Sequence, residues 1–319
     1  MERQPRLEDH FQQMLAEFTA GDPMREGVLW TNLSRREISR RLAELGTPTS
    51  RHTVRKLMRK HGLGQRQVRK KKSLGAPPDR DAQFHNIAQR KAVYLAAGDP
   101  VISIDTKKKA LIGNFAREGQ THTQTPVDVL DHDVPSAGDG NLIPHGIDDL
   151  ARNEGYLHRN TSHDTSEFCC DSIAAWWEQH GRDHYPEASR LLLLGDGGGS
   201  NAANRPVFKE ALQNLADRLE LEIRVAPYPP YCSKHNPIEH RLFPHITRAC
   251  QGVVFHSVAI AQQFMEKART STGLKVTVAI LTGVYETGKK CAADFLDTMR
   301  IVFDEHLPRW NYRAIPLQN

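Results

Sequence analysis

Residues 190–201 read RLLLLGDGGGSN, an apolar run followed by an aspartate and three consecutive glycines. The run over 190–194 predicts a short buried strand. Glycines directly after Asp196 allow the backbone to come close to a ligand or a metal. No Gly-Lys-Ser or Gly-Lys-Thr follows, and position 202 is Ala. The turn is therefore neither a phosphate-binding P-loop nor a complete Gly-x-Gly-x-x-Gly fingerprint.

A second apolar run also ends in an aspartate. Residues 101–104 (VISI) predict a buried strand ending at Asp105, and 110–115 (ALIGNF) predict a strand that returns beside it as a hairpin. Further along, the patterns predict a loop (117–145), a weak strand (146–150), helices (166–180 and 204–219), a strand (221–226), a helix carrying Ile238, Leu242, Phe243 and Ile246, and more helix towards the C-terminus. This order predicts a mixed α/β fold, with a central sheet flanked by helices.

The charge is unevenly distributed along the 319 residues. Residues 1–80 contain 18 Lys or Arg and 9 Asp or Glu, a net charge of +9, whereas the whole chain carries +5. No acidic residue occurs between Glu44 and Asp79. A basic N-terminal part on a mildly acidic body is typical of a nucleic-acid-binding arm, and a solvated basic linker is the alternative.

Two short helices are predicted within this basic part. Residues 34–37 (SRRE) have the Ser-x-x-Glu form of a capping box, and Gly46 marks the end of the first helix. The second helix begins after Ser50 or Thr49 and has one apolar and one basic face. The pair predicts a helix-turn-helix, and a helical hairpin with a basic surface is the alternative. The side chains expected to face DNA are Arg51, His52, Arg55, Lys56 and Arg59.

These patterns predict three parts of the chain. Residues 1–72 form the helix-turn-helix module, with a phosphate-contacting arm over 66–72. Residues 73–99 form a linker and a connecting helix. Residues 100–319 form an α/β catalytic domain with C-terminal helices.

Three carboxylates are candidates for a metal site. Asp105 and Asp196 follow apolar strands, and Glu239 lies in the first turn of a helix after a third strand. If the two strands are neighbours, both aspartates reach one edge of the sheet, where the helix can add Glu239. Clustered carboxylates repel each other unless cations are present, and oxygen ligands suit Mg²⁺. Two such ions ~3.5–4 Å apart are a known arrangement for in-line attack on a phosphodiester.

Other charged residues are expected at the surface. Lys107 and Lys108 in the predicted turn, and Lys234 in the loop YPPYCSKHN (228–236), are expected to contact DNA. Asp148 and Asp149 are expected to be solvated or to cap a turn.

Composition argues against several classes. No apolar run approaches the ~20 residues that span a bilayer, and the first residues lack the apolar core of a secretory signal, so no membrane partner and a cytoplasmic, nucleoid-associated location are expected. The five cysteines form no Cys-x-x-Cys pair, and the 16 histidines show no zinc-binding spacing.

Four stretches in the same chain carry a family resemblance: VISIDTKKKALIGNF (101–115), GIDDLARNEG (146–155), DGGGSN (196–201) and SKHNPIEHRLF (233–243). Together they resemble the ISAzo-type (Rhodopirellula-type) DDE insertion-sequence transposases. The resemblance implies a ribonuclease-H-like core in which Asp105, Asp196 and Glu239 bind two Mg²⁺ ions, for which Mn²⁺ can substitute. It also implies DNA partners, namely terminal inverted repeats and a target, and a homo-oligomer on that DNA.

The expected activity is therefore metal-dependent DNA cleavage followed by strand transfer. Three alternatives remain open: a ribonuclease-H-like nuclease or resolvase without strand transfer, a non-enzymatic DNA-binding regulator, and an inactive truncated copy. A truncated copy is considered because family members usually have a further N-terminal DNA-binding region.

Overall fold

The computed structural model describes residues 5–18, 20–21, 29–66 and 78–317. The chain divides into two compact units, Met1–Lys71 and Lys72–Asn319, which are described separately. Residues 67–77, which contain most of the predicted arm and linker, lie outside the described residues. In the described part of the chain, no helix is long and apolar enough to cross a membrane.

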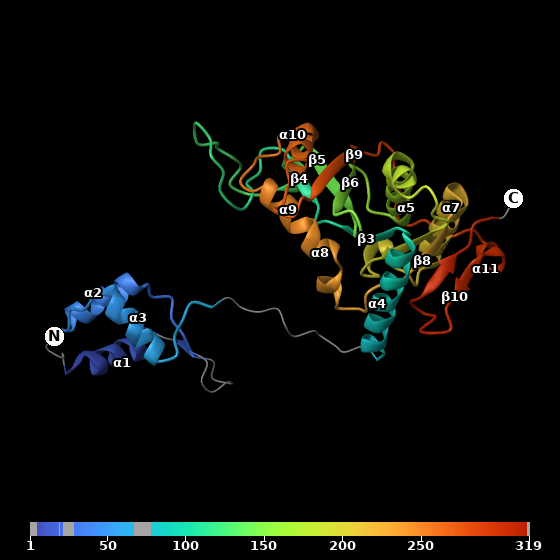
Figure 1. Cartoon of the computed structure of the whole chain (residues 1–319). Helices are drawn as coiled ribbons and strands as arrows, with labels where there is room; N and C mark the ends of the chain where they lie inside the picture. The colour runs from blue at the N-terminus through green and yellow to red at the C-terminus, as the bar shows by residue number, and fades with distance from the viewer. Residues whose placement is uncertain (1–4, 19, 22–28, 67–77, 318–319) are drawn as a thin grey trace. The chain divides into compact units, whose positions relative to one another are not determined.

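The first unit is built from three helices, α1 (Leu7–Phe18), α2 (Arg35–Glu44) and α3 (Arg51–Lys60), and a two-stranded pair, β1 (Ala20–Gly21) and β2 (Leu29–Trp30) (Figure 1). The capping box at α2 is confirmed: Glu37 N donates to Ser34 Oγ (3.2 Å) and Ser34 N to Glu37 Oε2 (2.9 Å). Ser50 caps α3. Helix α1 was not predicted. Its Phe11 and Met14 complete a buried core with α2 and α3.

The second unit contains a nine-stranded sheet in its described residues. Its strands are β3 (Val101–Thr106), β4 (Ala110–Ile112), β5 (Gly140–Asp149), β6 (Glu154–Asn160), β7 (Arg190–Leu194), β8 (Glu222–Val225), β9 (Lys275–Ile280), β10 (Ile301–Phe303) and β11 (Tyr312–Ala314). The spatial order is β10-β11-β8-β7-β3-β5-β6-β9, with β4 paired to β5. Strands β3, β5 and β6 are antiparallel neighbours, whereas β7 and β8 run parallel to β3. This central order is that of a ribonuclease-H-like sheet, so the predicted mixed α/β class of this unit is confirmed.

The predicted hairpin between 101–104 and 110–115 is wrong. Strand β4 pairs with β5 and not with β3, and β3 also pairs with β5. Strand β5 is ten residues long, so it begins inside the segment predicted as a loop. A long loop connects β4 to β5, and Figure 1 shows it extending away from the sheet. A ten-residue strand can pair with two short strands at different points along its length, which removes the need for a hairpin.

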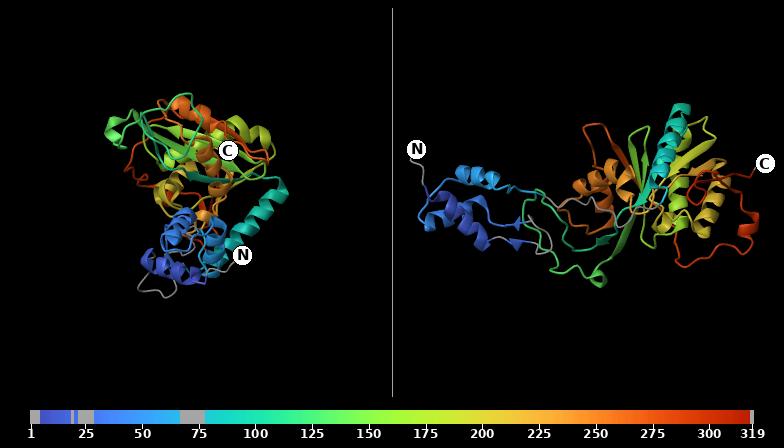
Figure 2. Two further views of the ribbon diagram at one scale, coloured as in Figure 1. Left: turned by 90° about the vertical axis from the view of Figure 1, so that its left-hand side faces the viewer. Right: turned by 90° about the horizontal axis from the view of Figure 1, so that it is seen from below.

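Helices cover both faces of the sheet. The helices are α4 (Arg80–Ala97), α5 (Ser166–Trp176), α6 (Arg182–His184), α7 (Pro206–Leu219), α8 (Ile238–Arg241), α9 (Phe243–Ala249), α10 (Val258–Met265) and α11 (Phe295–Thr298). Ile102 and Ile104 pack in one core with residues of α5 and α7, whereas Val101 packs in another core with residues of α4. Because successive side chains of a strand point to opposite faces, α4 lies across the sheet from α5 and α7 (Figures 1 and 2).

The C-terminal part contains strands as well as the predicted helices. It contains the helices α10 and α11, but three strands, β9, β10 and β11, are also found there. Strand β9 adds to β6, and β11 adds to β8, so each extends one side of the sheet.

Candidate active site and nucleic-acid surface

The register of the sheet brings two of the three predicted acids level with each other. Strands β3 and β7 are parallel neighbours, and Ser103 is the partner of Leu194. The pairing ends there, because Asp196 lies two residues beyond the end of β7; extending the same offset brings Asp105 and Asp196 level with each other. Both acids continue the alternation of residues that face α4, since Val101 and Leu194 pack in that core. Asp105 and Asp196 therefore lie at the same edge and on the same face.

A hydrogen-bonded clamp holds the start of α8 against β3. Ser103 Oγ donates to Asn236 Oδ1 (2.5 Å) and accepts from Ile238 N (3.1 Å). Asn236 Nδ2 donates to the carbonyl oxygen of Ile104 (2.9 Å). Ser103 and Asn236 are both fully buried. Because Ile104 precedes Asp105 and Ile238 precedes Glu239, the clamp brings the third acid to the first.

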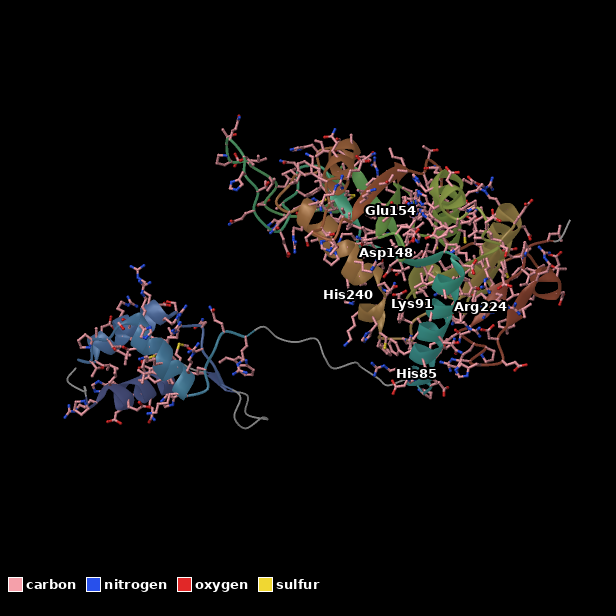
Figure 3. The ribbon with its side chains drawn as sticks, viewed as in Figure 1. His85, Lys91, Asp148, Glu154, Arg224 and His240 are labelled. Atoms are coloured by element: carbon pink, nitrogen blue, oxygen red, sulfur yellow. The ribbon has the colours of Figure 1, made fainter. Side chains whose placement is uncertain are left out.

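The far end of α8 is fixed by an ion pair. Arg241 Nε donates to Asp148 Oδ2 (2.8 Å). Asp148, which is labelled in Figure 3, belongs to β5. Asp148 and Asp149 are both fully buried, so neither is solvated. Asp149 does cap a turn, as the alternative expectation had it, because its Oδ1 accepts from the backbone N–H groups of Ala151 (3.1 Å) and Arg152 (3.3 Å). Burial raises the pKa of Asp148 to about 6 against the opposing effect of Arg241. A glycine lets α8 and α9 approach this strand: a Cβ at Gly146 would lie 2.8 Å from Ile238 Cδ1 of α8 and 2.7 Å from a ring carbon of Phe243, the first residue of α9.

The three acids interact electrostatically. The pKa of Asp105 is raised to about 8, first by burial and then by the charge of Asp196, with further contributions from the charge of Glu239 and a hydrogen bond to its side chain. The backbone N–H of Thr106 opposes this shift by donating to Asp105 Oδ1 (2.7 Å). An edge where two carboxylates disfavour the ionisation of Asp105 is suited to a cation.

The donor set fits a hard divalent cation, because all three side chains offer carboxylate oxygens. Among the residues that the structure describes, however, no three His, Cys, Asp or Glu side chains are gathered closely enough to hold a metal ion. The raised pKa of Asp105 and the absence of such a cluster are compatible, because charges affect a pKa over greater distances than the ~2.0–2.1 Å of a Mg²⁺–oxygen bond. The acids are thus neighbours that do not yet enclose a coordination site.

Comparison with known proteins gives the family. The sequence pattern described as "Rhodopirellula transposase DDE domain" matches residues 10–316, nearly the whole chain. The chain belongs to this transposase family. The predicted family is therefore confirmed.

Solved structures with partial similarity include those of Mos1 transposase. The chain is 12% identical to the protein in the "Mos1 transposase paired-end complex with left transposon end", with a TM-score of 0.46. The similarity covers 84% of this chain and 72% of that chain. For the "Crystal structure of the Mos1 mariner paired end complex with Mn", the identity is 13% and the TM-score is 0.45. That similarity covers 81% of this chain and 70% of that chain. No curated protein matches the chain.

In the transposase, the residues predicted to face DNA in the first unit are all exposed: Arg51, His52, Arg55, Lys56 and Arg59. The opposite face of α3 is buried through Val54 and Leu57. A cavity of about 400 Å³ lies where α2 and α3 begin, lined by Ser34, Arg35, Arg36, Arg51, His52 and Arg55. None of these lining residues is acidic, so the cavity is suited to an anion.

The three lysines predicted to contact DNA in the second unit differ in their surroundings. Lys108 and Lys234 are exposed. Lys107 is half-buried, and its Nζ donates to Thr247 Oγ1 (2.7 Å). Burial lowers the pKa of Lys107, while the charge of Glu239 opposes this shift. Lys107 is thus within electrostatic reach of the acidic edge.

Sequence patterns missed the two clamp residues, Ser103 and Asn236. Ser103 alternates with isoleucines in an otherwise apolar strand, and Asn236 stands directly before the Pro-Ile-Glu of α8. A polar residue in a strand predicted to be buried was the available signal, since such a group requires a partner.

Proposed function

We propose that this transposase binds the terminal inverted repeats of its element and cuts and joins DNA at the edge that carries Asp105, Asp196 and Glu239. The main support is geometric: parallel β3 and β7 lead Asp105 and Asp196 to one edge, and the hydrogen bonds of Ser103 and Asn236 hold the start of α8 beside it. The raised pKa of Asp105, to which both other acids contribute, agrees with this placement. Three carboxylates, two that follow neighbouring strands and one from a helix, would suit a divalent cation at this edge.

The three carboxylates would hold Mg²⁺, or Mn²⁺ in its place, and neutral oxygen ligands would come from water and DNA. A pair of such ions supplies an activated nucleophile and stabilises the leaving oxygen of a phosphodiester. The chain's own residues orient the site, since Ser103 and Asn236 fix Glu239 relative to Asp105. Lys108 and Lys234 neutralise phosphates on either side.

Two reactions follow each other in this proposal. In the first, water attacks the phosphorus at the element end, a P–O bond forms, and the bond to the 3′ oxygen breaks to leave a 3′-hydroxyl. In the second, that hydroxyl attacks a target phosphodiester and displaces its 3′ oxygen. An element has two ends, so we infer a multimer on the DNA, acting on the nucleoid in the cytoplasm.

The first unit supplies the affinity for DNA in this proposal. The exposed basic side chains of α3 enter the major groove, and Arg35 and Arg36 of α2 contact the backbone. Most of the binding energy comes from neutralised phosphates, so affinity falls steeply as salt rises.

The test uses the full chain and a plasmid that carries the DNA flanking its own coding region. With Mg²⁺, we expect cleaved ends and products joined to a second plasmid, and Asp196→Asn removes both. Asp131→Asn is the control, because that carboxylate is 91% exposed in a loop. Cleavage without joining indicates a nuclease. DNA binding without divalent-dependent cleavage contradicts the proposal.

A further inference from the structure

The loop between β8 and α8 is tied beside both aspartates. At its start, Tyr228 N donates to the carbonyl oxygen of Gly195 (2.7 Å), the residue before Asp196. At its end, Asn236 donates to the carbonyl oxygen of Ile104, the residue before Asp105. The loop therefore spans the acidic edge, with its tip between the two attachments.

The same loop is braced against α4. Gln83 Nε2 donates to the carbonyl oxygen of Pro227 (2.9 Å). The ring of Phe84 lies 5.8 Å from that of Tyr228 and 5.1 Å from that of His235, between ring centroids. Inside the loop, Cys232 N donates to Pro229 O (3.1 Å). The tip is thus held rigidly and is not free to collapse onto the protein.

Tyr231 stands at this tip in an unusual conformation. Its φ is +62°, in the left-handed region that a bulky aromatic residue rarely adopts. Its side chain is 64% exposed. Within the described residues, its ring makes no hydrogen bond and no ring contact. A strained, rigidly held and unpartnered aromatic ring beside an acidic edge is better explained by a ligand than by folding.

We propose that Tyr231 stacks on a base of the DNA strand next to the phosphate that is cut. This inference rests on the proposed function. An aromatic face binds any base, because every base has a π-face, so the contact does not depend on sequence. Lys234, exposed three residues later, supplies the charge for the neighbouring phosphate. The rigid loop reduces the entropy lost when the strand binds. The base that stacks is one that has left the helical stack, since the neighbouring bases of a duplex cover both of its faces.

The direct test is photochemical crosslinking with the full chain. The probe is a duplex with a single-stranded extension in which 5-iodouracil replaces thymine, and irradiation joins this base to an aromatic ring stacked on it. Mass spectrometry of the digest is expected to find the adduct on Tyr231. Adducts elsewhere in the second unit, with none on Tyr231, overturn the proposal. An adduct on Tyr231 without any cleavage leaves the stacking standing and contradicts the proposed function alone.

Variants separate a ligand role from a structural one. Tyr231→Ala is expected to lower the cleavage rate at subsaturating DNA about 5-fold to 160-fold, which corresponds to the ~1–3 kcal/mol of one stacked base. Tyr231→Trp is expected to restore it. Tyr231→Gly is expected to lose the same activity while its melting temperature stays level or rises, because glycine tolerates a positive φ. A melting temperature several degrees lower shows a structural ring and overturns the proposal.

Glu220→Gly is the matched control. Glu220 also has a positive φ (+57°), is exposed, and ends α7. Its replacement is expected to affect melting in the same direction as Tyr231→Gly and to leave cleavage and crosslinking unchanged. Equal losses of cleavage in both glycine variants assign the effect to the backbone and overturn the stacking role.

Discussion

Replacing Asn236 by alanine tests whether the clamp positions Glu239. The change removes the hydrogen bonds to Ser103 and to the carbonyl oxygen of Ile104. Both partners are buried, and each buried group left unsatisfied costs about 1–3 kcal/mol. Ser103 keeps the N–H of Ile238 as a donor, so its loss is partial. We expect the free energy of unfolding to fall by about 2–4 kcal/mol.

The effect on activity is expected to be larger than the loss of stability explains. Glu239 lies three residues after Asn236, and α8 has only four residues to hold it. A displacement of ~1 Å in a catalytic group can cost about 100-fold in rate. We expect a loss of that order in divalent-dependent cleavage, measured well below the melting temperature, where the variant is folded.

Gln213→Ala is the matched control for this experiment. Gln213 is also buried; its Nε2 donates to the carbonyl oxygen of Ile315 (2.7 Å), and its Oε1 accepts from the backbone N–H of Arg300 (3.0 Å). It is expected to destabilise the fold by a similar amount and to leave cleavage per folded molecule nearly intact. If Asn236→Ala cleaves at the wild-type rate, or if both variants lose activity equally, the positioning argument is wrong.

Four further predictions concern the acidic edge and the basic surface. Because burial and the neighbouring acids raise the pKa of Asp105 to about 8 in the metal-free protein, Mg²⁺ must displace its proton. The affinity for Mg²⁺, measured by calorimetry, should therefore rise as the pH increases to about 8 and then level off. An affinity that does not change with pH contradicts this. Gly146→Ala should push α8 away from β5. We expect the free energy of unfolding, measured with denaturant, to fall by about 1–3 kcal/mol and the cleavage activity to fall as well. The raised pKa of Asp148 contributes stability that is fully present below its unfolded pKa of about 3.8 and is lost as the pH rises through about 6. Asn does not titrate, so the stability of Asp148→Asn relative to wild type should increase between pH 4 and 7. The free energy of unfolding, measured at each pH, tests this. Arg51→Ala should weaken DNA binding and reduce the slope of log affinity against log salt concentration by about 1. Arg40 is already paired with Glu44, so Arg40→Ala should change neither the affinity for DNA nor this slope.

Local patterns predicted the elements that carry their own signals. The capping box starts α2 where Ser34 and Glu37 placed it, and the apolar run before Asp196 forms β7. The strands ending at Asp105 and Asp196 are neighbours, as the candidate site required. The assignment of Asp105, Asp196 and Glu239 as metal ligands stays a prediction, and so do the helix-turn-helix and the residues that contact DNA.

The errors arose where pairing partners decide the structure. Strand β5 contains Pro144, His145, Asp148 and Asp149, a composition that does not suggest a buried strand. These side chains are tolerated because distant residues accommodate them; Arg241, for example, pairs with Asp148. Strands β10 and β11 are three residues long each, and such short segments become strands only because β8 offers an edge.

The sequence by itself determined the family, the mixed α/β class and the acids worth testing, because these depend on residue types and on spacing along the chain. Tertiary structure alone decided that β4 joins β5, that Asp148 is buried, and that Ser103 and Asn236 hold α8. It also decided that Tyr231 stands strained and exposed at a braced tip. Each of these depends on contacts between residues far apart in the chain, whose energies no local pattern contains.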